Sequence, residues 1–313
     1  MTARRTFLVA ATVLLGSAVV AFATRMSAIL ASHPAYLAAL VLAALAGGAL
    51  LVAGLRSRSA GGGPWRIAGR VALILGALVV ATGLLWLRPF AATDAGLRAL
   101  EPGDGVTVSE SATRIRLRPT GRRRGATLVF IPGARVDPRA YAATLRPLAE
   151  QGYPVVIVKP ALGVGLLARG AASDEARKAA RDGQAVAVGG HSLGGTAAAM
   201  VVERERAADG LLLWASFPAG DALASWTDLV VTSISGDRDG LATPQDIADS
   251  RKDLPPQTRF VVIPGAVHAD FGDYGAQRGD GERAIGHEEA QREIIAASLR
   301  FMREVAATRP AAP

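Results

Sequence analysis

Three long apolar runs occupy the first ninety residues of this 313-residue chain. They extend from Phe7 to Ala23, from Tyr36 to Leu55 and from Ile67 to Leu87. The second and third have about the 20 mostly apolar residues that a helix needs to cross the hydrocarbon core of a bilayer. Trp65 and Trp86 stand near the ends of the third run, and tryptophan suits the headgroup interface. The runs therefore predict a membrane anchor of three transmembrane helices over residues 1–90.

The arginines around these runs set the expected topology. Only Arg25 lies between the first and second runs, and Arg4 and Arg5 precede the first. The connection between the second and third runs is arginine-rich, with Arg56, Arg58, Arg66 and Arg70. Because such loops stay in the cytoplasm, three crossings place everything after Leu87 on the other side. We expect a multi-pass protein of the cell membrane whose C-terminal domain is extracytoplasmic.

Two other interpretations of the apolar runs remain open. The basic start, short apolar core and Ala21-Phe22-Ala23 of the first run also fit a cleavable signal peptide. We favour an uncleaved helix because apolar residues resume at Ile29, and cleavage would leave the C-terminal domain on the same side. The runs could also be core helices of a soluble protein, but three full-length runs in series are hard to bury in that way.

The composition of the chain excludes several kinds of catalysis, metal site and partner. It contains no cysteine, which excludes disulfides, thiolate catalysis and cysteine zinc sites. The formal charge of +8 lies largely beside the apolar runs, so it indicates membrane topology and a lipid bilayer partner rather than nucleic acid. The cluster Arg122–Arg124 lies between two expected strands, where we expect a solvated loop, with an anion or lipid contact as the alternative.

The rest of the chain alternates strand and helix patterns. Residues 91–105 are expected to be a linker, and residues 106–313 a catalytic domain. The expected strands are Val106–Val108, Thr113–Leu117, Thr127–Ile131, Tyr153–Lys159, Ala185–Gly189, Leu211–Ala215, Leu229–Ile234 and Phe260–Ile263. The expected helices are one that starts at Pro138, with Asp137 as N-cap and Gly152 past its end, and Asp174–Arg181, Thr196–Arg206, Gln245–Arg251 and Glu288–Val305. This alternation predicts an α/β fold, with a mostly parallel sheet flanked by helices on both faces.

One motif in this domain is typical of a nucleophilic serine. Gly190-His191-Ser192-Leu193-Gly194 directly follows an expected strand and directly precedes an expected helix. A serine on a sharp strand-to-helix turn projects its hydroxyl above the sheet, and glycines at both ends of the motif avoid collisions there. We therefore predict Ser192 as the nucleophile and Gly190 and Gly194 as elbow glycines. The N–H of Leu193, at the helix N-terminus, is placed to bind an oxyanion.

A serine hydroxyl needs a base, and the base needs an acid to orient it. His268, after the strand Phe260–Ile263, is the candidate base. Asp239, after the strand Leu229–Ile234, is the candidate acid, and Asp237 in the same loop is the alternative. A second oxyanion donor is expected from the loop after an earlier strand, where we assign the N–H of Ala134.

The stretch from about Leu128 to Arg303 resembles an α/β-hydrolase, of the branch similar to dienelactone-hydrolase-like and chlorophyllase-like proteins. The matching residues are Phe-Ile-Pro-Gly at 130–133, Asp137 to Tyr141, the serine motif, Gly236 to Asp239 and Gly265 to His268. The segment from Val267 to Gly275 resembles the histidine loop of that branch. The resemblance implies acyl chemistry without a metal or an organic cofactor, and its Gly-x-x-Asp spacing favours Asp239. Dienelactone hydrolases use a cysteine nucleophile, which this chain lacks, so their substrate is not carried over.

Together these observations predict a membrane-anchored serine hydrolase that cleaves a carboxylic ester or a related acyl bond through an acyl-enzyme. Its partner would be a small-molecule acyl substrate, and the sequence does not fix an oligomeric state. Two alternatives remain open. One is a catalytically silent hydrolase fold used for binding or as a scaffold. The other is a thioesterase, peptidase or perhydrolase on the same fold, since fold does not determine function.

Overall fold

A computed structural model of the chain describes residues 2–57, 63–206 and 208–309. The chain divides into two compact units, an N-terminal unit, Met1–Pro89, and a C-terminal unit, Phe90–Pro313. Arg58, one of the arginines expected in the cytoplasmic loop, lies outside the described residues.

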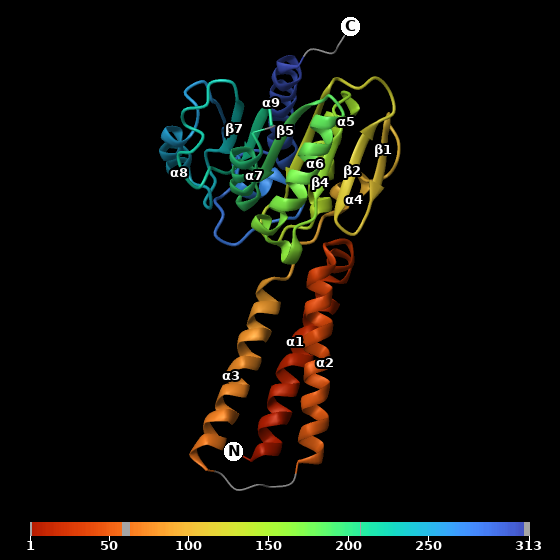
Figure 1. The fold of residues 1–313 in the computed structure, drawn as a ribbon, viewed down its shortest axis with the longest axis vertical. Helices are drawn as coiled ribbons and strands as arrows, with labels where there is room; N and C mark the ends of the chain where they lie inside the picture. The colour runs from red at the N-terminus through yellow and green to blue at the C-terminus, as the bar shows by residue number, and fades with distance from the viewer. Residues whose placement is uncertain (1, 58–62, 207, 310–313) are drawn as a thin grey trace. The chain divides into compact units, whose positions relative to one another are not determined.

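The N-terminal unit consists of long apolar helices (Figure 1). They are α1 (Ala3–Ala31), α2 (Pro34–Arg56) and α3 (Pro64–Trp86). Within the described residues these three are long and apolar enough to cross a membrane, as the sequence predicts. α1 continues past the expected end of its run and is interrupted at Arg25, whose φ of −141° is not helical.

Small residues let these helices pack closely. A Cβ atom at Gly47 of α2 would press against the side chain of Leu15 in α1, and one at Gly54 would press against Leu8. Close approach through glycine is typical of helix packing in membranes. α2 and α3 are also joined by a hydrogen bond, in which the Tyr36 hydroxyl donates to the carbonyl oxygen of Leu84 at 2.6 Å.

The C-terminal unit is built on an eight-stranded sheet in the order β1-β2-β4-β3-β5-β6-β7-β8. The strands are β1 (Val106–Glu110), β2 (Arg114–Pro119), β3 (Ala126–Ile131), β4 (Val155–Val158), β5 (Ala185–His191), β6 (Gly210–Trp214), β7 (Val230–Gly236) and β8 (Arg259–Ile263). β1 and β2 form an antiparallel hairpin, and β2 pairs antiparallel with β4. The remaining pairs are parallel, so the predicted α/β fold with a mostly parallel sheet is confirmed.

Helices cover both faces of this sheet (Figure 1). The helices are α4 (Asp94–Arg98), α5 (Ala142–Glu150), α6 (Arg169–Arg181), α7 (Leu193–Glu205), α8 (Pro244–Asp249) and α9 (His287–Thr308). Successive side chains of a strand point to opposite faces. In β3, Leu128 and Phe130 join the core under α5 and α9, whereas Val129 and Ile131 join the core under α6 and α7. The fully buried run of β3 is therefore packed on both faces.

The strand order determines where the loops that carry Ala134 and Ser192 leave the sheet. β3 lies between β4 and β5, and the helices that follow β3 and β5 cover opposite faces of the sheet. In open α/β sheets, ligands usually bind at the carboxyl ends of two such strands, where the chain switches from one face to the other. Ala134 follows β3, and Ser192 follows β5.

The segment 91–105 is not the linker that we expected. It belongs to the C-terminal unit and contains the short helix α4. The buried guanidinium group of Arg146 in α5 fixes this segment by donating hydrogen bonds to the carbonyl oxygens of Ala99, Glu101 and Gly103, at 2.8, 2.6 and 2.6 Å. The prediction failed because these contacts join residues more than forty positions apart.

Candidate active site

The serine of the Gly-His-Ser-Leu-Gly motif occupies a sharp turn between a buried strand and a helix. β5 ends at His191 and α7 begins at Leu193, so Ser192 is the single residue between them. Its φ of 52° and ψ of −130° form a conformation that non-glycine residues rarely adopt. Two hydrogen bonds hold this conformation. The N–H of Ser192 donates to the carbonyl oxygen of Trp214 (2.9 Å), and the Ser216 hydroxyl donates to the carbonyl oxygen of Ser192 (2.6 Å). The turn has the geometry of a nucleophile elbow, and strain of this kind concentrates at functional sites.

The two elbow glycines are required by close backbone contacts. A Cβ atom at Gly190 would collide with the carbonyl group of Gly194. A Cβ atom at Gly194 would collide with the carbonyl oxygens of Ile131 and Pro132, at the end of β3. The elbow therefore packs directly against the loop that carries Ala134, and a larger residue at either position would force the two apart.

His268 and Asp239 form a buried hydrogen-bonded pair. Nδ1 of His268 lies 2.8 Å from Oδ2 of Asp239, and both side chains are almost fully buried. The other oxygen of Asp239 accepts hydrogen bonds from the N–H groups of Leu241 and Ala242, each at 2.8 Å. Because Asp239 accepts the hydrogen bond from Nδ1–H, the imidazole keeps Nε2 as its basic nitrogen.

Asp237, the alternative acid, has a different partner. Its Oδ1 accepts a hydrogen bond from the N–H of Gly265 at 2.6 Å, in the loop that leads to His268. The imidazole is hydrogen-bonded by Asp239 and not by Asp237 in the described part of the chain. The geometry therefore favours Asp239 as the orienting carboxylate.

Ser192 and His268 come to the same edge of the sheet from distant parts of the chain. The ring centroids of His268 and of His191, the neighbour of Ser192, are 4.5 Å apart. Among the described residues, no hydrogen bond joins the Ser192 hydroxyl to Nε2 of His268. Catalytic hydrogen bonds of this type are often long without substrate and tighten in the Michaelis complex.

Two backbone N–H groups predicted as oxyanion donors make no hydrogen bond with any described residue. They belong to Leu193 and Ala134. Leu193 is the first residue of α7, where N–H groups lack intrahelical acceptors and carry the positive end of the helix dipole. By contrast, the N–H of Gly133 donates to the Tyr141 hydroxyl at 2.9 Å. Among the described residues, the N–H groups of Leu193 and Ala134 are therefore not occupied by another acceptor.

A chain of hydrogen bonds joins the loop of Ala134 to the elbow. The Tyr141 hydroxyl accepts from the N–H of Gly133, so its own proton is donated to Nδ1 of His191 at 2.9 Å. Burial lowers the pKa of His191 well below its usual value, and a positive charge on His268 lowers it further. Burial also raises the pKa of Tyr141. Both groups therefore remain neutral near pH 7 and serve to hold the two loops together.

Asp280 lies beside the candidate pair, and no local pattern in the sequence pointed to it. Its Oδ1 accepts hydrogen bonds from the N–H groups of His268 (3.0 Å) and Gly240 (3.2 Å), and its Oδ2 accepts from the N–H of Ala269 (2.8 Å). Gly240 directly follows Asp239 in the chain. One carboxylate thus ties the loop of Asp239 to the loop of His268, so Asp280 is a candidate positioning residue.

We expect Asp280→Ala to lower kcat by about 10²-fold, because displacements of about 1 Å in a catalytic group have effects of this size. KM should change little, since Asp280 holds the base and acid rather than the substrate. Steady-state hydrolysis of a model ester would measure both constants. Asp221→Ala, at an exposed aspartate, is the matched control. A rise in KM at unchanged kcat would contradict the positioning role.

His287 holds the other side of the histidine loop. Its Nδ1 lies 2.9 Å from Asp270, and its Nε2 lies 3.1 Å from Asp273. Hydrogen bonds to Asp270 and then to Asp273 raise the pKa of His287 to about 9, so it is positively charged at neutral pH. The carboxylates of Asp270 and Asp273 are buried and need a positive charge beside them. The imidazolium itself, with Arg283 at 2.6 Å from Asp270, supplies that positive charge.

Within the described residues, no group of three or more His, Cys, Asp or Glu side chains is arranged to hold a metal ion. The candidate groups at the edge of the sheet where the elbow lies are an imidazole, a carboxylate and backbone N–H donors. They can activate a hydroxyl, move its proton and bind an oxyanion.

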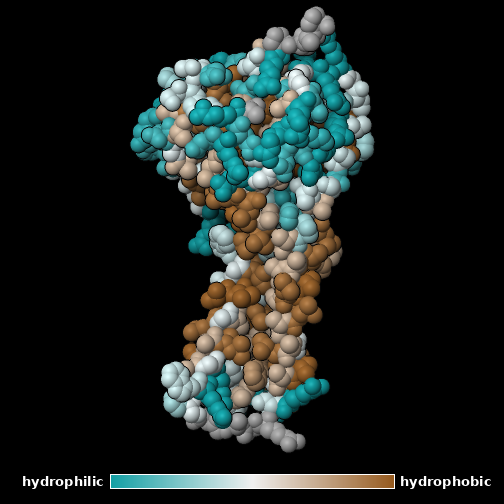
Figure 2. All heavy atoms as spheres, in the orientation of Figure 1, coloured by the Kyte–Doolittle hydropathy of each residue, from teal (hydrophilic) through white to brown (hydrophobic). Residues whose placement is uncertain are grey.

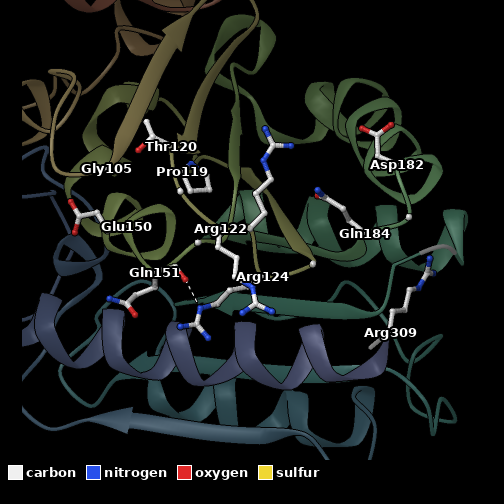
Figure 3. A pocket seen from close by; sticks show the side chains of 15 residues that line it. Gly105, Pro119, Thr120, Arg122, Arg124, Glu150, Gln151, Asp182, Gln184 and Arg309 are labelled. Carbon is white, nitrogen blue, oxygen red and sulfur yellow. Dashed lines mark hydrogen bonds between the residues drawn. The ribbon is translucent and has the colours of Figure 1, made fainter. Parts of the chain in front are cut away.

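A large hollow of the C-terminal unit lies away from these residues. It measures about 860 Å³ and is lined by the turn Arg122–Arg124 and by the C-terminal ends of α5, α6 and α9. Figure 3 shows Arg124 pointing to Gln151, whose carbonyl oxygen accepts from its Nε at 2.6 Å. Carbonyl groups at helix C-termini carry partial negative charge, so they accommodate these exposed arginines. The hollow is at the end of β3 opposite to Ala134, and none of the candidate catalytic residues lines it.

Comparisons with known proteins identify the class. A family model described as the alpha/beta hydrolase family matches residues 127–293, more than half of the chain. The chain belongs to the alpha/beta hydrolase family, and this membership favours a hydrolase. No curated protein matches the sequence.

Several solved structures are similar to the chain at low identity. A proposed dienelactone hydrolase from Klebsiella pneumoniae is 18% identical, with 64% of this chain and 98% of that one covered and a TM-score of 0.46. A serine hydrolase homologue from Coxiella burnetii is 14% identical, with coverage of 64% and 98% and a TM-score of 0.46. An esterase from Thermogutta terrifontis is 14% identical, with coverage of 67% and 95% and a TM-score of 0.48.

Proposed function

We propose that the protein is a membrane-anchored serine hydrolase that cleaves a carboxylic ester or a related acyl bond. The observation that carries this proposal is the buried pair His268–Asp239, which lies at the same edge of the sheet as the strained elbow serine. A base oriented by a carboxylate beside a serine on a nucleophile elbow is the arrangement that acyl transfer requires.

The proposed mechanism uses each group in turn. The oxygen of Ser192 attacks the substrate carbonyl while Nε2 of His268 takes the hydroxyl proton, and Asp239 stabilises the imidazolium that forms. The N–H groups of Leu193 and Ala134 bind the oxyanion, and loss of one such donor typically costs about 10²–10³ in rate. His268 then protonates the leaving alcohol, which leaves an acyl-enzyme. Water attacks this ester with His268 as base, and the acid product leaves as Ser192 regains its proton.

Covalent labelling with a fluorophosphonate probe tests the assignment. We expect one adduct, and peptide mapping by mass spectrometry should place it on Ser192. Denatured protein is the control, because a serine without its base reacts poorly with this probe. Absence of labelling in the folded protein would favour the catalytically silent alternative, and an adduct on another residue would contradict the site.

We also propose that α1, α2 and α3 anchor the protein in the cell membrane. Large apolar side chains are exposed along these helices, and Figure 2 shows hydrophobic residues over their surface. Helices that are apolar on all sides belong in a protein core or in a membrane. The arginines at the ends of α2 and α3 favour a cytoplasmic loop between them, so the C-terminal unit would be extracytoplasmic.

Reporter fusions test this topology. We expect alkaline phosphatase fused after Thr308 to be active, because that enzyme works only outside the cytoplasm. The same reporter fused after Arg56, in the arginine-rich loop, is the matched control and should be inactive. A fluorescent protein that folds only in the cytoplasm should give the opposite pattern, and the reverse result at both sites would invert the proposed orientation.

A further inference from the structure

An apolar segment, Ala161–Ala168, borders the site between the loop of Ala134 and the elbow. Its eight residues, Ala-Leu-Gly-Val-Gly-Leu-Leu-Ala, include no polar side chain. It follows β4 and forms two short 3₁₀ turns before α6 begins at Arg169. A surface loop is usually rich in polar residues and turn formers. A plain connection between β4 and α6 would therefore not need a segment of this composition, which indicates another role.

The segment is fixed to both sides of the candidate oxyanion site. On one side, the carbonyl oxygen of Gly163 accepts a hydrogen bond from the N–H of Arg135, the residue after Ala134, at 2.7 Å. On the other side, Gly165 lies against the elbow, because a Cβ atom placed there would be 3.1 Å from Cα of Gly194. A chain that extends in this direction from a carbonyl group bound at Ser192 would meet the segment within a few bonds.

The segment also presents apolar surface to solvent. Within the described C-terminal unit, the large apolar side chains that are exposed are Leu167 (58%), Val262 (51%) and Leu241 (38%). Leu162 in the same segment has a φ of 55°, a left-handed conformation that bulky residues rarely adopt. Strained backbone concentrates at functional sites, and here it lies in an apolar segment that contacts the elbow and carries an exposed leucine.

We propose that the substrate is an amphiphile whose acyl part is a long hydrocarbon chain, and that this chain lies along Ala161–Ala168. The proposal rests on the hydrolase function proposed above and names its substrate class. The hydrocarbon removes Leu167 and its neighbours from water, while the ester carbonyl remains at Ser192. Each methylene that leaves water in this way contributes up to about fourfold to kcat/KM, equivalent to about 0.8 kcal/mol.

The path of the chain supports a bilayer as the source of such a substrate. Only Leu87, Arg88 and Pro89 separate the end of α3 from Phe90. The backbone of Phe90 donates to the carbonyl of Arg135 at 2.7 Å and accepts from the N–H of Asp137 at 2.9 Å. Three residues therefore link the proposed membrane anchor to a segment that is hydrogen-bonded to the loop of Ala134, which favours a substrate taken from the bilayer.

The test compares chain lengths with the purified full chain in detergent micelles. We expect kcat/KM for p-nitrophenyl octanoate to exceed that for p-nitrophenyl acetate by at least tenfold. Leu167→Ser should lower this octanoate-to-acetate ratio at least fivefold, because it replaces an apolar contact with a hydroxyl. Val262→Ser, which changes an equally exposed residue of β8, is the matched control and should leave the ratio unchanged.

The outcomes separate this proposal from the proposed function. Hydrolysis of acetate with no preference for octanoate would overturn the substrate class and leave the hydrolase intact. Equal ratios for the wild type and Leu167→Ser would overturn the placement of the chain along Ala161–Ala168. If neither ester is hydrolysed and the fluorophosphonate probe forms no adduct, the function itself fails, and this proposal fails with it.

Discussion

Replacing Ser192 with alanine is expected to abolish ester hydrolysis. The change removes the atom that forms the acyl-enzyme, so turnover should fall by about 10⁶-fold, the loss seen when a serine protease loses its nucleophile. Any remaining rate would come from the oxyanion donors Leu193 and Ala134 and from substrate binding. Hydrolysis of p-nitrophenyl acetate over several hours would measure it, and an active-site probe should no longer label the protein.

The fold should survive this substitution, which makes the result interpretable. Ser192 is held through its backbone N–H and carbonyl groups, and alanine keeps both. Serine already bears the strain of this positive φ, about 1–3 kcal/mol for such a residue, and alanine bears about the same, so the free energy of unfolding should change little. Ser225→Ala, at an exposed serine, is the control for loss of a hydroxyl. Turnover in Ser192→Ala above about a hundredth of the wild-type rate would show that another residue is the nucleophile.

The parts of the fold that the sequence predicted are those with local signals. The run Thr127–Ile131 lacks the alternation of a half-exposed strand, and β3 is buried on both faces as such a run requires. The elbow was predictable for a similar reason. Its glycines, its serine and the flanking strand and helix all lie within about twenty residues, so one window of sequence contains the whole arrangement.

The parts that sequence reasoning missed depend on contacts between distant residues. Asp280 lies in a stretch without helix or strand and is joined to Gly240, forty positions earlier. Tyr141 and His191, which connect the loop of Ala134 to the elbow, are fifty positions apart. An aspartate or tyrosine in a loop often has an ordinary structural role. Its neighbours in sequence do not distinguish a positioning residue from a helix cap or a packing aromatic.

The assignment of the acid shows how structure decides between candidates that sequence leaves close together. Asp237 and Asp239 share one loop, and both follow β7. In an extended chain, residues two positions apart point in similar directions, so composition and spacing alone cannot separate them. The turn after Gly236 separates them, because Asp237 binds the N–H of Gly265 while Asp239 binds the imidazole of His268.

Asp239→Asn is accordingly expected to lower kcat/KM by about 10⁴-fold with little change in structure. The amide has nearly the shape of the carboxylate and still offers one oxygen to the N–H groups of Leu241 and Ala242. Its other atom would be an NH₂ group facing Nδ1 of His268. The imidazole would then accept at Nδ1 and carry its proton on Nε2, where it could no longer take the proton of Ser192.

The matched variant is Asp237→Asn in the same loop. It should lower kcat/KM less than tenfold, because the amide oxygen can still accept from the N–H of Gly265. Raising the pH distinguishes a loss of base catalysis from a structural loss of activity. Hydroxide can attack in place of an activated serine at high pH, so a loss of base catalysis is then partly bypassed. The ratio of wild-type to Asp239→Asn activity should therefore shrink between pH 7 and pH 10. If instead Asp237→Asn showed the 10⁴-fold loss and Asp239→Asn the small one, the roles of the two carboxylates would be reversed.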